Sequence, residues 1–226
     1  CRSFRGSWMF SYAAALRTAE VETIFVCFSR TVKTIVRRTH EPTGAGVLVL
    51  PLPRVFRALA RDPYGRTVRQ TFGRKALPAT PLLAPVKVLL PYLSTPVRLL
   101  ARELHREGVA AVLCQEYEFP RFDICVLAKP LHGLPVFGVY QGSDYRRWRL
   151  ERFVRPRAIG RCDGLVVGPR AEVERVVQLY GPPAPKIARI LNPVDVEVFR
   201  PTDRQAARRR LGLPAGARIA VWHGRV

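Results

Sequence analysis

Six short runs of unbroken apolar residues limit most strongly the folds that this chain can adopt. Runs of β-forming residues without polar alternation are typical of strands buried on both faces of a parallel sheet. A further run, residues 219–222, stands apart near the end of the chain. The six runs cover residues 23–28, 46–52, 109–114, 135–140, 164–167 and 186–191.

Amphipathic segments between the runs predict helices. One helix is expected to follow Thr95, a favourable N-cap that precedes a proline, and to end at Gly108. The apolar face of this helix is formed by residues at helical spacing, namely Val97, Leu100, Ala101 and Leu104.

Two more helices are expected in the second half of the chain. The first covers about residues 170–180 and is closed by Gly181. The second runs from Arg204 to Leu211, with Asp203 as its cap. By contrast, residues 53–95 are rich in Pro and Arg and predict a loop with short helical pieces.

Strand–helix alternation with short connections predicts an α/β fold with a Rossmann-like, doubly wound parallel sheet. Such sheets bind ligands at the carboxyl ends of their strands. Residues that follow the third and fourth runs are therefore candidates for a binding cleft: Glu116, Tyr117, Gln141, Gly142, Ser143 and Asp144. Asp144 can equally serve as the N-cap of a helix that starts at the next residue.

The net charge of +21 is extreme for 226 residues, and 33 of the 38 basic residues are Arg. One interpretation of this skew is a bias of codon usage toward Arg. The functional interpretation is attraction to an anionic partner, that is, a membrane surface, a phosphorylated substrate or nucleic acid. No RNA-binding aromatic motif, zinc-finger spacing or basic zipper is present in the sequence, so nucleic acid ranks last among these partners.

Cysteine content indicates a reducing compartment, and we expect a cytoplasmic protein. The five cysteines are odd in number and form no Cys-x-x-Cys pair, and Cys27 and Cys114 lie in apolar runs as small hydrophobic residues. No run of about 18 apolar residues predicts a transmembrane helix. The segment 6–16 loosely resembles the apolar core of a signal peptide, but an amphipathic first helix explains it better.

The sequence offers no metal or nucleophile motif. None of the four His residues has metal-ligand spacing to another His, Cys or carboxylate, and we expect His105 to be exposed on a helix. A Walker A loop, a Gly-x-Gly-x-x-Gly fingerprint and a Gly-x-Ser-x-Gly elbow are all missing from the sequence. We therefore expect neither a metal nor a resident cofactor.

Two segments, Arg161 to Gly168 and Lys186 to Pro201, resemble the retaining family-4 glycosyltransferases of the GT-B fold. In that family a Cys-Asp or Ala-Asp pair leads into a strand, and a Lys-Ile strand precedes an Asn-Gly-Val-Asp…Phe-x-Pro hinge. A helix ending Leu-Gly-Leu-Pro and a strand ending Gly-Arg follow. This chain shows each step in order, so that the resemblance covers residues 105–226 well and the first hundred residues weakly.

The resemblance implies two Rossmann-like lobes, of which the first binds the acceptor and the second a nucleotide-diphosphate sugar. It assigns residues 1–191 to an acceptor lobe whose first strand could be absent, 192–202 to a hinge, and 203–226 to the truncated start of the donor lobe. Asn192 and Pro193 then belong to the hinge. The intact enzyme would transfer a sugar to an acceptor hydroxyl with retention, and the fragment alone would be inactive.

The same resemblance places the donor diphosphate at Gly224 and Arg225. Glycine lets the backbone approach the phosphates, and a guanidinium fork matches phosphate oxygens. The alternatives are an ordinary strand-end turn at Gly224 and a surface Arg at 225. The family's catalytic carboxylates would lie beyond Val226, so that the catalytic residues are not assigned.

The chain departs from the family pattern at two positions. Pro193 stands where the family has Gly, which would stiffen the crossing between lobes. Gln141 stands where many members have His, so that no role of that His can be carried over.

The expected partners are a nucleotide sugar and a glycan or lipid-linked acceptor. Residues 86–106 mix apolar and basic side chains, and acceptor lobes of this family often contact membranes, so an anionic surface on the inner face of the membrane is a further candidate. The alternative is a core-packed helix with a solvated basic side. A second hypothesis for the whole chain is a stand-alone basic Rossmann-like module that binds anionic lipid or nucleic acid.

Overall fold

The computed structural model describes residues 8–59, 68–73, 75, 79–142, 149–181, 186–196 and 199–220. The chain divides into two compact units, Cys1–Asn192 and Pro193–Val226. Each unit is described by itself below.

A four-stranded parallel sheet forms the centre of the first unit. Its strands are β4 (Val112–Gln115), β5 (Val136–Val139), β6 (Gly164–Val166) and β7 (Ile187–Ala188), in the order β4-β5-β6-β7. All four coincide with apolar runs of the sequence, which confirms the α/β class and the Rossmann-like parallel sheet. The last run was predicted to be longer than the two residues of β7.

The N-terminal runs form a separate three-stranded sheet. Strand β1 (Ile24–Ser29) pairs in parallel with β3 (Ala45–Pro51), and β2 (Val36–His40) pairs antiparallel with the other side of β3. The sequence did not predict β2, because this edge strand carries Arg37 and Arg38 and is largely exposed. Buried residues of both sheets, such as Leu48 and Leu165, belong to one hydrophobic core.

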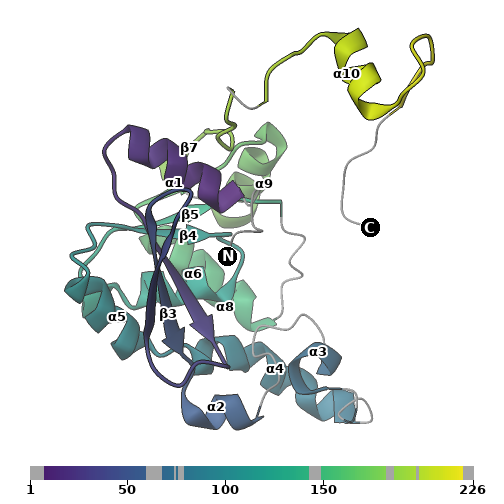
Figure 1. Cartoon of the computed structure of the whole chain (residues 1–226). Helices are drawn as coiled ribbons and strands as arrows, with labels where there is room; N and C mark the ends of the chain where they lie inside the picture. The colour runs from purple at the N-terminus through teal and green to yellow at the C-terminus, as the bar shows by residue number, and fades with distance from the viewer. Residues whose placement is uncertain are drawn as a thin grey trace. The chain divides into compact units, whose positions relative to one another are not determined.

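Helices accompany the strands of the first unit, and Figure 1 shows α1 and α9 in the upper part of this unit and α2, α3 and α4 in the lower part of the view. They are α1 (Trp8–Thr18), α2 (Arg54–Leu59), α3 (Val68–Phe72), α4 (Thr80–Ser94), α5 (Val97–Arg106), α6 (Pro120–Leu127), α7 (Lys129–His132), α8 (Arg149–Arg161) and α9 (Arg170–Tyr180).

The predicted end of helix α5 is confirmed, but its predicted cap is wrong. The amides of Gly108 and Val109 donate to the carbonyls of His105 and Leu104, and Gly108 has φ +63°, which is a Schellman motif. The cap at the start was expected from Thr95. Its hydroxyl instead donates to Pro91 O, at the end of α4, and α5 begins without a side-chain cap.

Helix α4 corrects the expectation of a loop with short helical pieces over residues 53–95. It spans 15 residues despite Pro85 and Pro91 in its interior, each of which removes one N–H from the ladder. The helix packs against α3 and α6, and the residues 87, 90, 91 and 94 form its buried side. Tertiary contacts therefore outweigh the local preference of the sequence here.

The second unit contains helix α10 (Arg204–Leu211), as predicted from its cap. Asp203 Oδ1 accepts the amide of Ala206 at 2.6 Å, and Gly212 ends the helix in the left-handed conformation. Arg208 is buried, and its guanidinium donates to three carbonyls of the loop that follows: Pro214, Ala215 and Ala217. Residues 219–220 form no strand, and the rest of that predicted strand lies outside the described residues.

Candidate functional site

The carboxyl ends of the parallel strands bring three polar side chains together. Gln141 lies two residues after β5, and Asn192 lies four residues after β7. The two amides bond reciprocally, with Asn192 Nδ2 donating to Gln141 Oε1 at 2.9 Å and Gln141 Nε2 donating to Asn192 Oδ1 at 3.2 Å. The hydroxyl of Tyr12, from α1, donates to the same Asn192 oxygen at 3.1 Å. We call Tyr12, Gln141 and Asn192 the edge cluster.

The edge cluster lies near the surface and is rich in donors and acceptors. Gln141 and Tyr12 are half-buried, and Asn192 is exposed. Burial raises the pKa of Tyr12, although a hydrogen bond with Gln141 opposes this, so that the phenol stays protonated and able to donate at neutral pH. Amides and a hydroxyl that both donate and accept are suited to an uncharged polar ligand such as a sugar or polyol.

Glu116 and Tyr117, which follow β4, are buried under this edge. Glu116 Oε2 accepts the backbone amide of Gln141 at 3.2 Å, which ties the two strand ends together. Tyr117 is fully buried, and its hydroxyl donates to Glu172 of α9. Burial and the hydrogen bond to Glu172 both raise the pKa of Tyr117. The aromatic ring is therefore part of the core beneath the edge.

Arg175 of α9 holds the buried carboxylates next to Tyr117. Its Nη2 lies 2.6 Å from Glu172 and 2.9 Å from Glu118, and it also donates to the hydroxyl of Tyr117 at 3.0 Å. The hydrogen bond to Glu172 is the main reason that the pKa of Arg175 is raised. These groups bond one another, so this network fixes α9 on the end of β4.

Other candidates from the sequence lie elsewhere or outside the described residues. Gly142 is exposed and has φ +84°, a conformation that suits glycine in the turn after β5. Pro193 begins the second unit. The remaining four candidates lie outside the described residues and stay predictions: Ser143, Asp144, Gly224 and Arg225.

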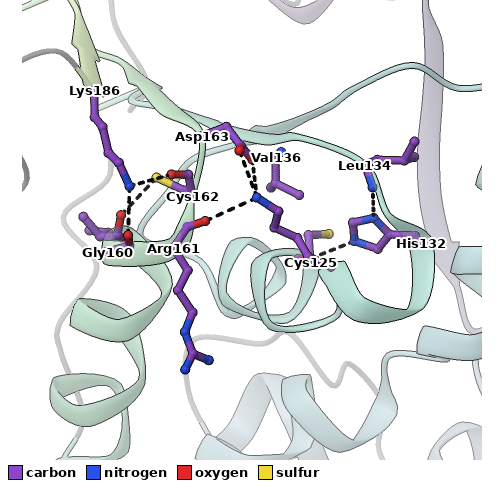
Figure 2. Close-up of polar contacts among 11 residues, drawn as sticks. Cys125, His132, Leu134, Val136, Gly160, Arg161, Cys162, Asp163 and Lys186 are labelled. Atoms are coloured by element: carbon purple, nitrogen blue, oxygen red, sulfur yellow. Dashed lines mark hydrogen bonds and ion pairs between the residues drawn. The ribbon is translucent and has the colours of Figure 1, made fainter.

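The amino ends of the strands hold charged side chains in a different way, as Figure 2 shows. Asp163, just before β6, accepts the amide of Val136 at 2.7 Å and pairs with Lys129 Nζ at 2.7 Å. Lys186, just before β7, donates to the carbonyls of Gly160 and Cys162 at 2.8 and 3.0 Å. The lysine therefore caps the carboxyl end of helix α8, where a cation is favoured.

His132, at the same end of the sheet, is structural. It is buried, its Nε2 donates to Cys125 O at 2.9 Å, and its Nδ1 accepts the amide of Leu134 at 3.1 Å. This pattern requires the neutral ring with its proton on Nε2. His105 is exposed as expected, and its Nε2 lies 2.7 Å from His132 O.

A buried ion pair that the sequence did not reveal joins α6 to α8. Arg155 donates to Asp123 through Nε at 2.5 Å and Nη2 at 3.0 Å, and Tyr92 of α4 donates to the same carboxylate at 2.7 Å. Burial raises the pKa of Asp123, while Arg155 opposes this. No spacing in the sequence signals this arrangement, because Tyr92, Asp123 and Arg155 come from three separate helices.

The cysteines correct one expectation. Cys27 is exposed on β1, although it lies in an apolar run of the kind expected for a strand buried on both faces, while Cys114, Cys125 and Cys162 are buried. Among the described residues, no group of three or more His, Cys, Asp or Glu side chains could hold a metal ion. Within the same residues, no helix has the length and apolar composition needed to cross a bilayer.

A groove of about 260 Å³ lies between α9 and β7. Its walls are Val173, Val177 and Ile187, with Arg170 and Arg189 beside them. Arg170 Nε bonds Glu174 and Arg189 Nε bonds Gly168 O, so that both side chains are partly engaged with the protein. The groove is open, and it lacks a buried polar group that would orient a ligand.

Comparison with known proteins shows similarity to glycosyltransferases. The chain is 35% identical over 112 residues to a D-inositol 3-phosphate glycosyltransferase of Thermobispora bispora, a stretch covering 44% of this chain and 26% of that protein. D-inositol 3-phosphate glycosyltransferase 1 of Catenulispora acidiphila is 40% identical over 102 residues, or 44% and 24% of the two chains. The enzyme of that name from Mycobacterium tuberculosis is 37% identical over 70 residues, or 31% and 15%.

The chain thus spans about a quarter or less of the length of these curated relatives. The family model of Glycosyltransferase Family 4 matches residues 8–198, which include both sheets and the whole edge cluster. The chain belongs to glycosyltransferase family 4.

Proposed function

We propose that the first unit binds the acceptor of a glycosyltransferase that moves a sugar from a nucleotide-diphosphate sugar to an acceptor hydroxyl, with retention. The edge cluster is the observation that carries this proposal. It gathers Tyr12, Gln141 and Asn192 at the carboxyl ends of parallel strands, where α/β sheets bind ligands. Its amide and phenol groups match the hydroxyls of a sugar or polyol.

The donor side of the proposal rests on the family alone. Gly224 and Arg225 would meet the diphosphate, whose leaving-group charge is stabilised by backbone amides and a guanidinium. With these groups in place, we propose that transfer uses no resident metal or cofactor. We also propose that the 226-residue chain binds the acceptor without catalysing transfer.

The relatives' name supplies the first acceptor to test. Purified chain is titrated with D-inositol 3-phosphate by calorimetry, with unphosphorylated inositol and a lipid-linked glycan as alternatives. We expect saturable binding that weakens in Gln141→Ala and is unchanged in Glu41→Ala, an exposed acidic residue outside the edge cluster. Saturable binding of none of the three acceptors would refute the proposal.

Transfer is tested in a chimera, in which residues 1–192 are joined to the C-terminal part of the Thermobispora bispora relative. The chimera should transfer sugar from a nucleotide-diphosphate donor, and the anomeric configuration of the product, read by NMR, should be that of the donor. An inverted product contradicts retention. Turnover by the 226-residue chain alone contradicts the assignment of the first unit as acceptor lobe only.

Helix α4 supports a second, finer proposal, which is a cytoplasmic protein that docks on the inner face of the membrane. Its outward side is apolar, since Leu82, Val86, Leu89 and Leu93 are all exposed and follow one another at helical spacing. Lys87, expected from the sequence on the basic side, is instead buried. The apolar stripe of α4, rather than the basic residues of 86–106, therefore faces outward.

The basic composition of the sequence that contains this stripe favours an anionic bilayer as the partner. Residues 54–102 contain ten Lys or Arg and a single acidic residue, Asp62. An apolar helical face within a basic stretch of chain is suited to the interface of a membrane with anionic lipid.

Vesicle sedimentation tests this docking surface. The chain should sediment with vesicles of phosphatidylglycerol and phosphatidylcholine, less with phosphatidylcholine alone, and Leu89→Glu should weaken binding. Leu131→Glu is the matched control, since Leu131 is an exposed leucine on α7. Equal loss in both variants, or tighter binding to nucleic acid than to vesicles, would instead favour a general basic binding module.

A further inference from the structure

Glu116 has a backbone conformation that is unfavourable for its residue type. Its φ is +71°, in the left-handed region, and among the described residues only one other non-glycine residue, Glu20 with φ +58°, has a positive φ. Strain of this kind persists only where the surrounding structure requires it. Glu20 lies in an exposed turn after α1, whereas Glu116 is 4% exposed.

The chain around Glu116 explains the turn but not the choice of Glu. The left-handed turn allows the amide of Tyr117 to donate to Val139 O at 3.0 Å. It also packs the Cβ atom of Tyr117 against Gly138, so closely that a Cβ atom added to Gly138 would lie only 2.8 Å from it. Glycine at position 116 would allow the same turn without strain. Burying a carboxylate is also costly, and Glu116 is buried.

The hydrogen bonds of the Glu116 carboxylate explain why Glu occupies this position. Its Oε2 accepts the amide of Gln141 at 3.2 Å, and its Oε1 lies 3.5 Å from the amide of Glu118. Gln141 in turn bonds Asn192, which also accepts from Tyr12. A continuous series of hydrogen bonds thus runs from the end of β4 across the ends of β5 and β7 to α1.

We infer that Glu116 is a positioning residue, which fixes Gln141 and through it the edge cluster in a preformed arrangement for the acceptor. The inference rests on the proposed function of that cluster. Glu116 is buried beneath the edge and acts on the acceptor through Gln141. Preformed polar groups bind more tightly because less ordering is needed on binding.

Three variants of the full chain test this role. Glu116→Gly allows the turn without strain but removes the carboxylate, and Glu116→Gln keeps an oxygen that can accept the Gln141 amide. Glu20→Gly is the matched control, since it relieves a left-handed residue in the exposed turn after α1 that is not a member of the edge cluster. The measurements are hydrogen exchange at the Gln141 amide, affinity for D-inositol 3-phosphate, and the thermal midpoint.

For Glu116→Gly we expect exchange at Gln141 to speed up about tenfold and affinity to fall about tenfold, the effect of one lost hydrogen bond of roughly 1.4 kcal/mol. In Glu116→Gln, exchange at the Gln141 amide and acceptor affinity should both lie within about threefold of the wild-type values. Glu20→Gly should change neither quantity. A merely structural residue would lower the thermal midpoint and leave the affinity of the folded chain unchanged.

Wild-type exchange and affinity in Glu116→Gly would overturn the inference. If the wild-type chain binds none of the tested acceptors, the proposed function fails, and Gln141 exchange alone then decides the role of Glu116. Faster exchange in Glu116→Gly with rescue by Glu116→Gln would support the positioning role in that case. Unchanged exchange would refute it.

Discussion

At the amino end of the four-stranded sheet, charged side chains bond the protein itself, whereas at the carboxyl end uncharged side chains bond one another near the surface. Asp163 accepts a hydrogen bond from a backbone amide at the start of β5, and Lys186 donates to backbone carbonyls at the end of α8. Gln141 and Asn192 hold mainly each other, through bonds that a ligand hydroxyl can replace. The difference separates residues that build the sheet from residues that can bind at its edge.

Two of the motifs that carry the family resemblance lie at the amino end of the sheet. The Cys162–Asp163 pair and Lys186 precede β6 and β7, and their contacts explain them without any ligand. Such motifs therefore report the fold of the lobe more than its chemistry. Of the motif residues, Asn192 alone belongs to the edge cluster.

Among the variants that test this difference between the two ends of the sheet, Asp163→Ala is expected to cause the largest loss of stability. It leaves the amide of the fully buried Val136 without its acceptor and Lys129 without its partner. We expect a loss of about 2 kcal/mol in unfolding free energy, or roughly 4–8 °C in thermal midpoint, with unchanged acceptor affinity. Glu41→Ala is the control, and a loss of acceptor affinity in folded Asp163→Ala would break the contrast.

Gln141→Ala should show the opposite pattern. We expect acceptor affinity to fall about tenfold, while the unfolding free energy changes by less than about 0.5 kcal/mol, because its bonds are near the surface. Calorimetric titration and denaturant melts measure the two quantities. A lower unfolding free energy together with wild-type acceptor affinity in Gln141→Ala would instead show that Gln141 is structural.

Lys186→Met is expected to have a smaller effect. It removes two bonds to the carboxyl end of α8 but keeps the apolar stem, so we expect a loss of about 1 kcal/mol in unfolding free energy. Lys33→Met, at an exposed position, is the control. Equal stability of the two variants would show that the contacts in Figure 2 do not stabilise the fold.

The smallest effect is a pH dependence at the amino end. Burial raises the pKa of Asp163, but bonds from Lys129 and Val136 outweigh it, so that the net pKa lies below its ordinary value. A lowered pKa gives stability that is present above about pH 4 and lost as the pH falls through the folded value. The difference in thermal midpoint between wild type and Asp163→Asn should therefore shrink below about pH 4, and a constant difference would contradict this.

Much of the fold follows from the sequence, because apolar runs and helix ends are local signals. Asp203 and Gly108 act at helix ends as predicted, and each of the six main runs contributes a strand. The polar strand β2 and the proline-containing helix α4 were missed, since both depend on packing against distant segments. Thr95 was assigned the wrong role because a proline beside it also suits the end of the preceding helix.

The candidate site could be located from the sequence only in part. The rule that ligands bind after parallel strands points to Gln141 and Glu116, but it does not distinguish a surface amide from a buried carboxylate. Tyr12 was missed, because nothing in the sequence of α1 signals a contact with a residue 180 positions away. The ion pair of Asp123 with Arg155 was missed for the same reason.

Residue-resolved NMR during titration with D-inositol 3-phosphate tests the central claim most directly. The account predicts shifts in the amide and side-chain signals of Gln141, Gly142 and Asn192, with those of Val136, Asp163 and Lys186 unchanged. Shifts confined to the amino end of the sheet, or spread equally over both ends, would contradict it.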